Sequence, residues 1–298
     1  MHVFGIDAGG TKTELLARDP ASGVERRYFG PAANVQRVGV DGAADALAGV
    51  ICEAMGSDPG PLIAFAGVAG AGRAEDQEAL TAALRTRLSE NAIVGITHDA
   101  DIALEGAFSG ESGIVIIVGT GSVVIGRTSD GRIERAGGWG FLLGDEGSGN
   151  AIGIEALRAL TVAFDGGPWT PLALRLQRHL DLPDGATLIR RVYREAWPVQ
   201  RAAPVVCTAA AEGDAEAATL LERQVALLAE QVVRLYVRCA SALVPRVAFL
   251  GGLAREPAFT ACLEHALKAT LPHLQIVLPQ GSPVEGAWHR ALRLRPVS

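Results

Sequence analysis

Residues 4–16 read FGIDAGGTKTELL and place a short polar, glycine-rich segment between two apolar runs. The apolar runs predict two antiparallel strands that are joined by a tight turn. Glycine has no Cβ, so it lets backbone N–H groups approach a phosphate closely, and threonine and lysine side chains add further donors. The stretch is therefore a candidate phosphate-binding hairpin, although an ordinary Gly-rich turn has the same pattern. Its candidate phosphate ligands are Gly9, Gly10, Thr11 and Lys12.

Asp7 lies on the first predicted strand of this hairpin, just before the glycines. Mg²⁺ prefers oxygen ligands, and it usually keeps several of its waters when it accompanies a polyphosphate. Asp7 is therefore a candidate for holding the hydrated magnesium ion of ATP.

The rest of the first half alternates between helical and extended patterns. Apolar residues at helical spacing predict helices, and short apolar runs bounded by proline or glycine predict buried strands. A third antiparallel strand is expected in residues 23–30, helices in 39–55, 74–88 and 101–110, and strands in 61–70 and 91–100.

The second half starts with the same order of elements. Residues 113–140 predict a strand, a Gly-Thr-Gly turn, a second strand, an Asp-Gly turn and a third strand, as in the opening of the chain. Residues 150–240 are mostly helical, and the run 216–243 has the strongest helical pattern. A strand in 246–254 and a strand, loop and helix in 275–294 complete the chain. This order predicts an α/β fold with two similar tandem domains, the second starting near Gly113.

Two further glycine motifs repeat the features of the first. GTGS at residues 119–122 follows the apolar run IVIIV, so the two turns could clamp one phosphate chain from both sides. FLGGLA at residues 249–254 ends a predicted strand with two glycines, which could seat a flat adenosine ring or form a plain strand-to-helix turn. Neither the turn in residues 4–16 nor the GTGS turn is a Walker A loop. No G-x-G-x-x-G opens a helix after the first strand, which disfavours a dinucleotide-binding fold.

Carboxylates occur where strands are expected to end. Asp99 and Asp101 follow a buried strand, and such a carboxylate could accept a hydroxyl proton, or it could simply cap a helix. For Asp101 the capping role is favoured. The loop at residues 137–149 holds Trp139, Asp145, Glu146 and Ser148 among six glycines. A tryptophan beside carboxylates suits a sugar, which has apolar faces and hydroxylated edges.

Composition excludes several classes of protein. The 298 residues are 49% hydrophobic and 20% charged, which is typical of a globular chain, and the net charge of −6 argues against a nucleic-acid-binding surface. There is no apolar run of about 18 residues for a membrane helix and no secretory signal, so we expect a cytoplasmic protein without a membrane partner. The four cysteines form no C-x-x-C pair, which favours reduced core thiols over a metal cluster.

The motifs GIDAGGTKT, GTGS, GGWGFLLGDEGS, FLGGLA and SPVEGA occur in the order seen in the acetate and sugar kinase/Hsp70/actin superfamily. More narrowly, the chain resembles the N-acetylglucosamine kinase branch of the BadF/BadG/BcrA/BcrD ATPase family over nearly its whole length. The resemblance implies two tandem actin-like ATPase (ribonuclease H-like) domains with an interdomain cleft. The first domain would comprise residues 1–112 and 284–298, and the second would comprise residues 113–283.

The resemblance also implies roles for individual residues. Asp99 would be the catalytic base, and Asp7 would hold Mg²⁺ through water. The ATP phosphates would contact Gly9, Gly10, Thr11, Lys12, Thr120 and Gly121, and the adenosine would lie beside Gly251 and Gly252. The sugar would contact Asn34, Gly70, Asp99, Gly138, Trp139, Gly140 and Asp145.

The implied activity is phosphorylation of N-acetylglucosamine by ATP to the 6-phosphate, in a homodimer. Residues 66–72, AGVAGAG, offer only alanine and glycine where eukaryotic N-acetylglucosamine kinases carry a substrate-binding serine. Glucosamine and N-acetylmuramic acid are therefore alternative substrates. An ATPase that activates a partner enzyme is an alternative of a different class, but no cysteine has the glycine-flanked setting that an iron–sulfur bridge needs there. A sensor without turnover is disfavoured by the presence of both Asp7 and Asp99.

Overall fold

The structure is a computed structural model that describes residues 1–19, 22–58, 60–89, 91–239 and 242–294. The chain forms two compact units: unit 1 contains Met1–Ser112 and Leu278–Ser298, and unit 2 contains Gly113–Val277. The chain returns to unit 1 after Val277, whereas the sequence places this return at residue 284. None of the helices in the described ranges is both long and apolar enough to span a bilayer.

Unit 1 is a five-stranded mixed sheet with helices on both faces. Three strands form an antiparallel meander, and two more continue the sheet parallel to the first strand. The strands are β1 (His2–Ala8), β2 (Thr13–Arg18), β3 (Glu25–Gly30), β4 (Leu62–Val68) and β5 (Ile93–His98), in the spatial order β3-β2-β1-β4-β5. The helices are α1 (Val35–Met55), α2 (Ala74–Arg85), α3 (Asp99–Phe108) and α10 (Pro283–Arg293).

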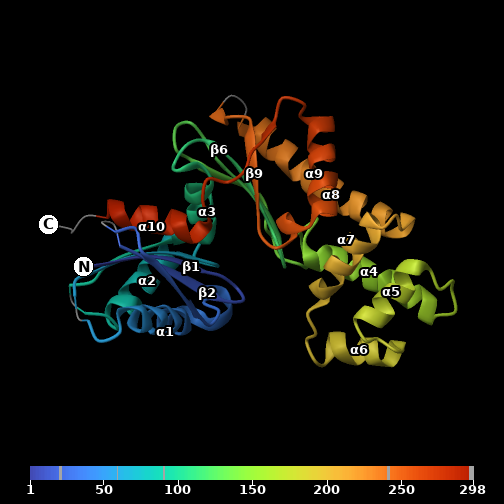
Figure 1. Cartoon of the computed structure of the whole chain (residues 1–298), viewed down its shortest axis with the longest axis horizontal. Helices are drawn as coiled ribbons and strands as arrows, with labels where there is room; N and C mark the ends of the chain where they lie inside the picture. The colour runs from blue at the N-terminus through green and yellow to red at the C-terminus, as the bar shows by residue number, and fades with distance from the viewer. Residues whose placement is uncertain (20–21, 59, 90, 240–241, 295–298) are drawn as a thin grey trace. The chain divides into compact units, whose positions relative to one another are not determined.

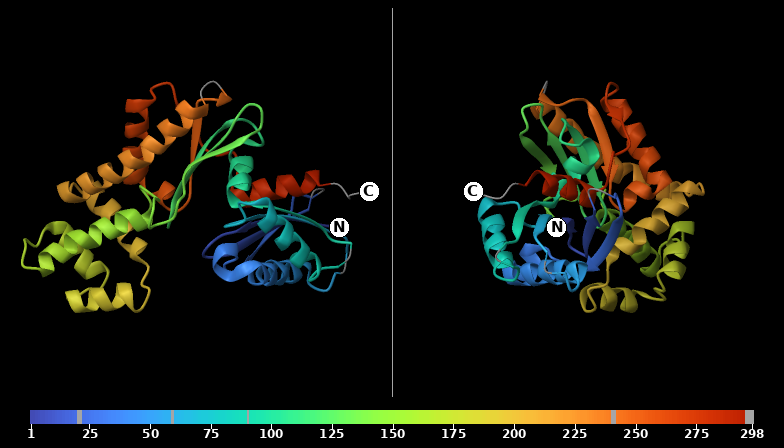
Figure 2. Two further views of the ribbon diagram at one scale, coloured as in Figure 1. Left: turned by 180° about the vertical axis from the view of Figure 1, so that it is seen from behind. Right: turned by 60° about the vertical axis from the view of Figure 1, so that its left-hand side comes forward.

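Alternation along β1 explains the two layers of helices. Successive side chains of a strand point to opposite faces. Phe4 and Ile6 therefore join the core formed with α1 and α2, whereas Val3 joins the core formed with α3 and α10. Figures 1 and 2 show α1 and α10 on opposite faces of this sheet.

Helix α1 begins earlier than the helical pattern predicts. It starts at Val35 because the Asn34 side chain caps it by accepting a hydrogen bond from Gln36 N at 2.9 Å. The backbone is non-helical at Gly39, where φ is +73°. This break separates the first turn from the regular apolar spacing that begins at residue 39, so the periodicity revealed only the second part.

Unit 2 repeats the strand order of unit 1 and adds a larger helical layer. Its sheet has the order β10-β9-β6-β7-β8, which is the same arrangement of meander and parallel strands as in unit 1. The strands are β6 (Gly113–Val118), β7 (Ser122–Arg127), β8 (Ile133–Gly137), β9 (Arg246–Leu250) and β10 (Gln275–Ile276). The helices are α4 (Gly149–Phe164), α5 (Pro171–His179), α6 (Gly185–Tyr193), α7 (Ala202–Ala211), α8 (Ala215–Cys239) and α9 (Pro257–Thr270).

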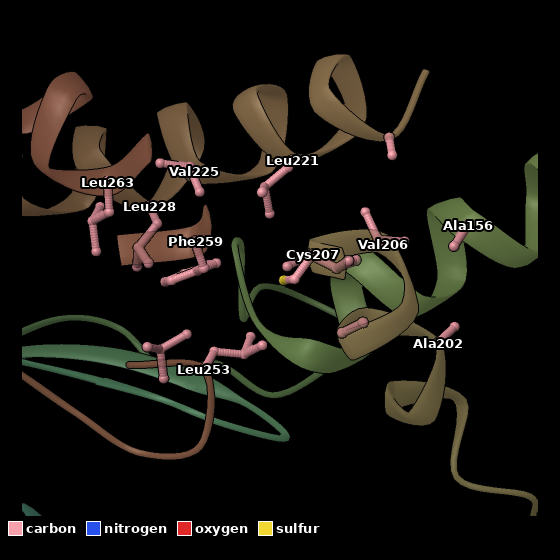
Figure 3. Packing of buried hydrophobic residues seen from close by; sticks show 14 of the residues in the cluster. Ala156, Ala202, Val206, Cys207, Leu221, Val225, Leu228, Leu253, Phe259 and Leu263 are labelled. Carbon is pink, nitrogen blue, oxygen red and sulfur yellow. The ribbon is translucent and has the colours of Figure 1, made fainter. Parts of the chain in front are cut away.

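The core of unit 2 lies between its sheet and these helices. Figure 3 shows Leu228 of α8 beside Phe259 of α9, with Leu253 beneath them, and Val206 and Cys207 of α7 farther along the same cluster. Cys207 is part of this cluster, and its burial raises the pKa of the thiol to about 12. Cys52, by contrast, is exposed, so the prediction that all four cysteines are core thiols is wrong for this residue. Its helical position faces solvent rather than the sheet.

Helix α10 packs closely on α3, the helix that starts at Asp99. Ser282 and Glu285 form a capping box at the start of α10. A Cβ on Gly286 would lie 2.2 Å from Ile102 O, and one on Gly106 would lie 2.2 Å from Ser282 O. The two helices can therefore approach this closely only because both positions lack side chains.

Substitutions of two helical glycines should have opposite effects on stability. Gly286→Ala should lower the free energy of unfolding by about 3 kcal/mol, because the methyl group would displace α10 from α3. Gly49→Ala, on an exposed position of α1 with open space around it, should raise it by about 0.5–1 kcal/mol. Urea unfolding followed by circular dichroism measures both. Equal effects of the two substitutions would contradict the close α3–α10 contact.

Candidate functional site

In unit 1 the glycine hairpin forms the turn predicted from the sequence. Asp7 pairs with Glu14 across β1 and β2, and Gly9 N donates to Lys12 O at 2.9 Å, which closes the turn. Thr11 and Lys12 are exposed on it. The Lys12 ammonium lies 3.3 Å from the carboxylate of Glu14 and 4.9 Å from the ring centroid of Phe29. The turn therefore presents backbone and side-chain donors to solvent.

Three parallel strands of unit 1 end in register at the edge where this turn lies. Ala8 is paired with Val68, and Val68 with His98. The segments that follow β1, β4 and β5 therefore begin side by side, and they carry Gly9, Gly70 and Asp99 respectively. Asp7, one residue before the end of β1, belongs to the same edge.

Asn34 and Gly70 meet at this edge. A Cβ on Gly70, whose φ is +83°, would lie 2.8 Å from Asn34 Oδ1. Gln36 Nε2 also donates to Gly70 O at 3.1 Å, and Val35 N donates to Ala69 O at 3.0 Å. The Asn34 oxygen caps α1, which leaves the amide nitrogen as a donor for a ligand hydroxyl.

Asp99 is the first residue of α3, and its carboxylate is held close to the helix. Oδ1 accepts from Ala100 N at 2.9 Å and lies 3.0 Å from His98 Nδ1. Asp101, two residues on, accepts a hydrogen bond from the Thr97 hydroxyl. Asp101 therefore links the strand end to the helix, but it does not cap α3, because the N-cap is His98; the capping role predicted for Asp101 is wrong.

The carboxyl group of Asp7 is electrostatically unusual. Its pKa is raised from 3.8 to about 7, chiefly by burial and also by the negative charges of Asp99 and Glu14, while the charge of Lys12 lowers it. The group therefore sits where added negative charge is unfavourable and where a cation would be stabilised. Carboxylate oxygens at such a place fit a divalent ion that retains part of its water shell.

Asp7 should make the metal-free protein less stable as the pH rises. Its folded-state pKa of about 7 exceeds the ordinary 3.8, so its stabilising contribution is complete below about pH 4 and is lost between about pH 4 and 7. The loss amounts to at most about 4 kcal/mol at 1.36 kcal/mol per pKa unit. Asp7→Asn should therefore stabilise the protein at about pH 8 but not at about pH 4, as measured by urea unfolding in EDTA. The same stabilisation at both pH values would contradict the raised pKa.

In unit 2 the GTGS turn is fastened to the start of α4. Gly119 N donates to Gly121 O at 2.9 Å within the turn. Gly149 N donates to Gly119 O at 2.7 Å, and Asn150 N donates to Thr120 O at 3.1 Å. The carbonyl groups of the turn are therefore held by the first N–H groups of α4.

The double glycine after β9 adjoins this turn. β6 and β9 are parallel neighbours, with Ile117 paired to Leu250. Gly251 has φ of +103°, and a Cβ there would lie 2.2 Å from Val118 O. Gly252 N lies 3.8 Å from the Cβ position of Gly119. Unit 2 therefore brings together Thr120, Gly121, Gly251 and Gly252, as the predicted nucleotide site requires.

The glycine-rich loop after β8 folds back on the same turn through Asp145. This residue is 8% exposed, has φ of +61°, and accepts from Gly140 N at 3.1 Å. Burial raises its pKa, and hydrogen bonds from the N–H groups of Gly140 and Ser122 oppose this effect. A Cβ on Gly121 would lie 2.6 Å from Asp145 Oδ2. Asp145 therefore joins the loop to the GTGS turn.

Gly138 and Gly140 flank Trp139 with φ of +67° and +84°. The Trp139 side chain is 65% exposed, and the Arg135 guanidinium lies 4.9 Å from its ring centroid. An exposed indole of this kind can pack against the apolar face of a sugar.

Several residues beside the candidate site carry no signal in the sequence. Gln224 accepts from Gly147 N at 3.2 Å, and Gln231 donates to the Glu146 carboxylate. Both glutamines belong to α8. They are far along the chain from Glu146 and Gly147, so no sequence pattern indicates these contacts. Arg135 and His98 adjoin predicted residues in sequence, but neither belongs to a recognisable motif.

Known proteins resemble this chain over most of its length. The model of the BadF/BadG/BcrA/BcrD ATPase family matches residues 4–291, which confirms the resemblance inferred from the order of the motifs. An N-acetylmuramic acid/N-acetylglucosamine kinase of Clostridium acetobutylicum is 35% identical over 198 residues, covering 65% of this chain. The match spans 64% of the length of that relative, which is less than two thirds. Glucosamine kinase GspK of Vibrio cholerae is 28% identical over 300 residues, covering 96% of this chain and 94% of the relative.

A solved structure agrees with the fold. A crystal structure from Chromobacterium violaceum, provisionally assigned as an N-acetylglucosamine kinase, superimposes with a TM-score of 0.76 at 26% identity. It covers 97% of this chain and 98% of that chain. This similarity confirms the predicted α/β fold of two tandem actin-like ATPase halves.

Proposed function

The chain belongs to the BadF/BadG/BcrA/BcrD ATPase family, and from this premise we propose that it is an ATP-dependent kinase of an amino sugar. The favoured substrate is N-acetylglucosamine, and the products are its 6-phosphate and ADP. The names of the relatives support this choice, because they are kinases of N-acetylmuramic acid, N-acetylglucosamine and glucosamine.

The observation that carries the proposal is the proximity of Asp99 to Asp7 and the glycine hairpin in unit 1. Their strands end in register, and the charge of Asp99 contributes to the raised pKa of Asp7. A carboxylate beside a phosphate-binding turn can accept the proton of the hydroxyl that attacks the phosphoryl group.

In the proposed reaction, Asp99 accepts the proton of the sugar 6-hydroxyl as its oxygen forms a bond to the γ-phosphorus of ATP. The bond from the γ-phosphorus to the bridging oxygen breaks, and ADP leaves with that electron pair. Gly10 would donate its backbone N–H to the phosphates, with Thr11 and Lys12 adding side-chain donors. Gly9, whose N–H closes the turn on Lys12 O, would let the phosphates approach the backbone because it has no Cβ. Most of the rate enhancement would come from positioning and from charge stabilisation.

The residue roles implied by the family resemblance are kept as proposals. The sugar would contact Asn34, Gly70, Asp99, Gly138, Trp139, Gly140 and Asp145. ATP would contact the glycine hairpin at residues 9–12, and Thr120, Gly121, Gly251 and Gly252. We keep the two units as the proposed domains of the enzyme.

Asp7 would hold Mg²⁺ through water. Its buried carboxyl lies among like charges that a cation would compensate. No cluster of three or more histidine, cysteine, aspartate or glutamate ligands occurs among the described residues, so the ion would keep most of its waters. When bound, Mg²⁺ neutralises charge on the phosphates.

Glucosamine and N-acetylmuramic acid remain the alternative substrates, and an ATPase that activates a partner enzyme remains the alternative of a different class. We also propose a cytoplasmic homodimer without nucleic-acid or membrane partners, which is consistent with the net charge of −6.

A coupled assay of ADP release with ATP and Mg²⁺ tests the proposal. The panel contains N-acetylglucosamine, glucosamine, N-acetylmuramic acid, N-acetylmannosamine, glucose and a blank without sugar. We expect strong stimulation by N-acetylglucosamine. If only another amino sugar stimulates ADP release, that sugar is the substrate instead of N-acetylglucosamine. Equal ADP release in every well, including the blank, would contradict the proposal that the protein is a sugar kinase.

A further inference from the structure

The start of α3 places an imidazole against the carboxylate of Asp99. His98 is the last residue of β5 and the N-cap of α3, and its Nδ1 lies 3.0 Å from Asp99 Oδ1. The two side chains are 28% and 33% exposed, so each is partly shielded from water. The strand before them and the helix after them fix the two backbones.

The hydrogen bonds at this point determine which ring nitrogen carries the proton. The Ala100 N–H is directed at two acceptors: Asp99 Oδ1 at 2.9 Å and, as the N-cap contact of α3, His98 Nδ1 at 3.2 Å. An ionised carboxylate can only accept, so a bare Nδ1 would turn its lone pair toward Oδ1 at 3.0 Å, which is repulsive. With a proton on Nδ1, the bond from Ala100 N to Nδ1 is given up, but the Ala100 N–H keeps its shorter bond to Oδ1 and the imidazole donates to the same oxygen. The contact with Asp99 Oδ1 therefore favours the tautomer of His98 that carries its proton on Nδ1.

The ring lies near Gly72, in the loop after β4. A Cβ on Gly72 would lie 3.5 Å from Cδ2 of His98 and 3.9 Å from its Nε2. A side chain at position 72 would therefore meet the edge of the imidazole. Asp99 Oδ2 has no hydrogen-bond partner among the described side chains and backbone groups, so it is the oxygen left to receive a proton.

We propose that His98 is a positioning residue for Asp99. Its Nδ1–H binds Oδ1 and fixes the rotation of the carboxylate, so that Oδ2 is the oxygen presented to the substrate hydroxyl. This inference rests on the proposed function and on the role of Asp99 in it. It assigns to His98 no contact with the sugar or with ATP.

Steady-state kinetics of two His98 variants test this role. His98→Leu removes the donor and should lower kcat by about 10–100-fold, because the carboxylate would sample unproductive orientations. The KM for the sugar should change by less than about threefold, because the residue acts on the transition state. His98→Asn keeps an N–H donor at nearly the same place and should recover most of the lost kcat. His265→Leu, at an exposed position of α9, is the matched control and should behave as the unchanged protein.

A double-mutant cycle separates positioning from any other role. In an Asp99→Asn background, His98→Leu should lower kcat by less than about twofold, because the group through which it acts is already lost. The same loss of kcat in both backgrounds would overturn the proposal. So would a raised KM with unchanged kcat, which would make His98 a sugar ligand, and so would failure of His98→Asn to recover activity.

Nitrogen-15 NMR of the resting protein tests the contact without any turnover. We expect the Nδ1–H tautomer for His98, assigned by the loss of its signals in His98→Asn. The Nε2–H tautomer would overturn the inference even in an active kinase. The Nδ1–H tautomer in a protein without sugar kinase activity would instead leave the contact intact and reject the proposed function.

Discussion

Asp99→Asn should lower kcat by about 10²–10⁴-fold, which is the usual contribution of a general base. Asparagine has nearly the shape of aspartate and can still accept from Ala100 N, so α3 should keep its start. Its amide cannot take up the proton of the sugar hydroxyl at neutral pH. The KM for the sugar and the thermal unfolding temperature should therefore change little. Steady-state assays with the sugar identified by the panel measure these effects.

Asp101→Asn is the matched control for this substitution. The change is chemically identical, it lies in the same helical turn, and the new side chain can still accept from the Thr97 hydroxyl. We expect kcat within about threefold of the unchanged protein, as for a surface substitution away from the chemistry. If both variants lost activity equally, or if Asp99→Asn kept nearly normal turnover, Asp99 could not be the base.

Gly251→Ala should have the second largest effect, on both stability and ATP use. A methyl group there would lie 2.2 Å from Val118 O, and the positive φ of +103° is itself unfavourable for alanine. The ends of β6 and β9 would have to separate, which should lower the free energy of unfolding by about 3 kcal/mol. The KM for ATP should rise at least about tenfold, because the nucleotide ligands after both strands would move apart.

Gly252→Ala tests contact with the nucleotide separately, because alanine fits the backbone conformation at this position. Gly252 has φ of −65° and ψ of −45°, and no atom lies within 4 Å of its Cβ position. The unfolding temperature should therefore stay nearly unchanged. If adenosine lies against this residue, the added methyl group should still raise the KM for ATP, by about fivefold or more. An unchanged KM would remove Gly252 from the adenosine site, and a large loss of stability would contradict its open surroundings.

The strands and helices were largely predictable because their patterns are local. Apolar alternation and helical spacing predicted both three-stranded meanders and the helices that follow them, and they also predicted the final helix of the chain. The start of α1 was missed because Asn34 and the break at Gly39 act before the regular spacing begins. The exposure of Cys52 could not be predicted from its type, since it depends on which face of α1 meets the sheet.

The candidate site was predictable where a motif lies at a strand end. The register of β1, β4 and β5 brings Asp7, Gly70 and Asp99 to one edge, which follows from the parallel order of these strands. Contacts between distant segments were not predictable. The hydrogen bond from Gly147 N to Gln224 and the approach of Gly72 to His98 depend on tertiary packing, and no spacing in the sequence encodes them.

Transfer of a labelled γ-phosphate from ATP to N-acetylglucosamine is the most direct test of the account. The protein is incubated with labelled ATP, Mg²⁺ and the sugar, and the products are separated and identified. We predict that the label appears in the sugar, on its 6-oxygen, and that Asp99→Asn slows this transfer at least about 10²-fold while Asp101→Asn does not. Label that appears only as inorganic phosphate, at the same rate with and without an amino sugar, would contradict the proposal that this chain is a sugar kinase.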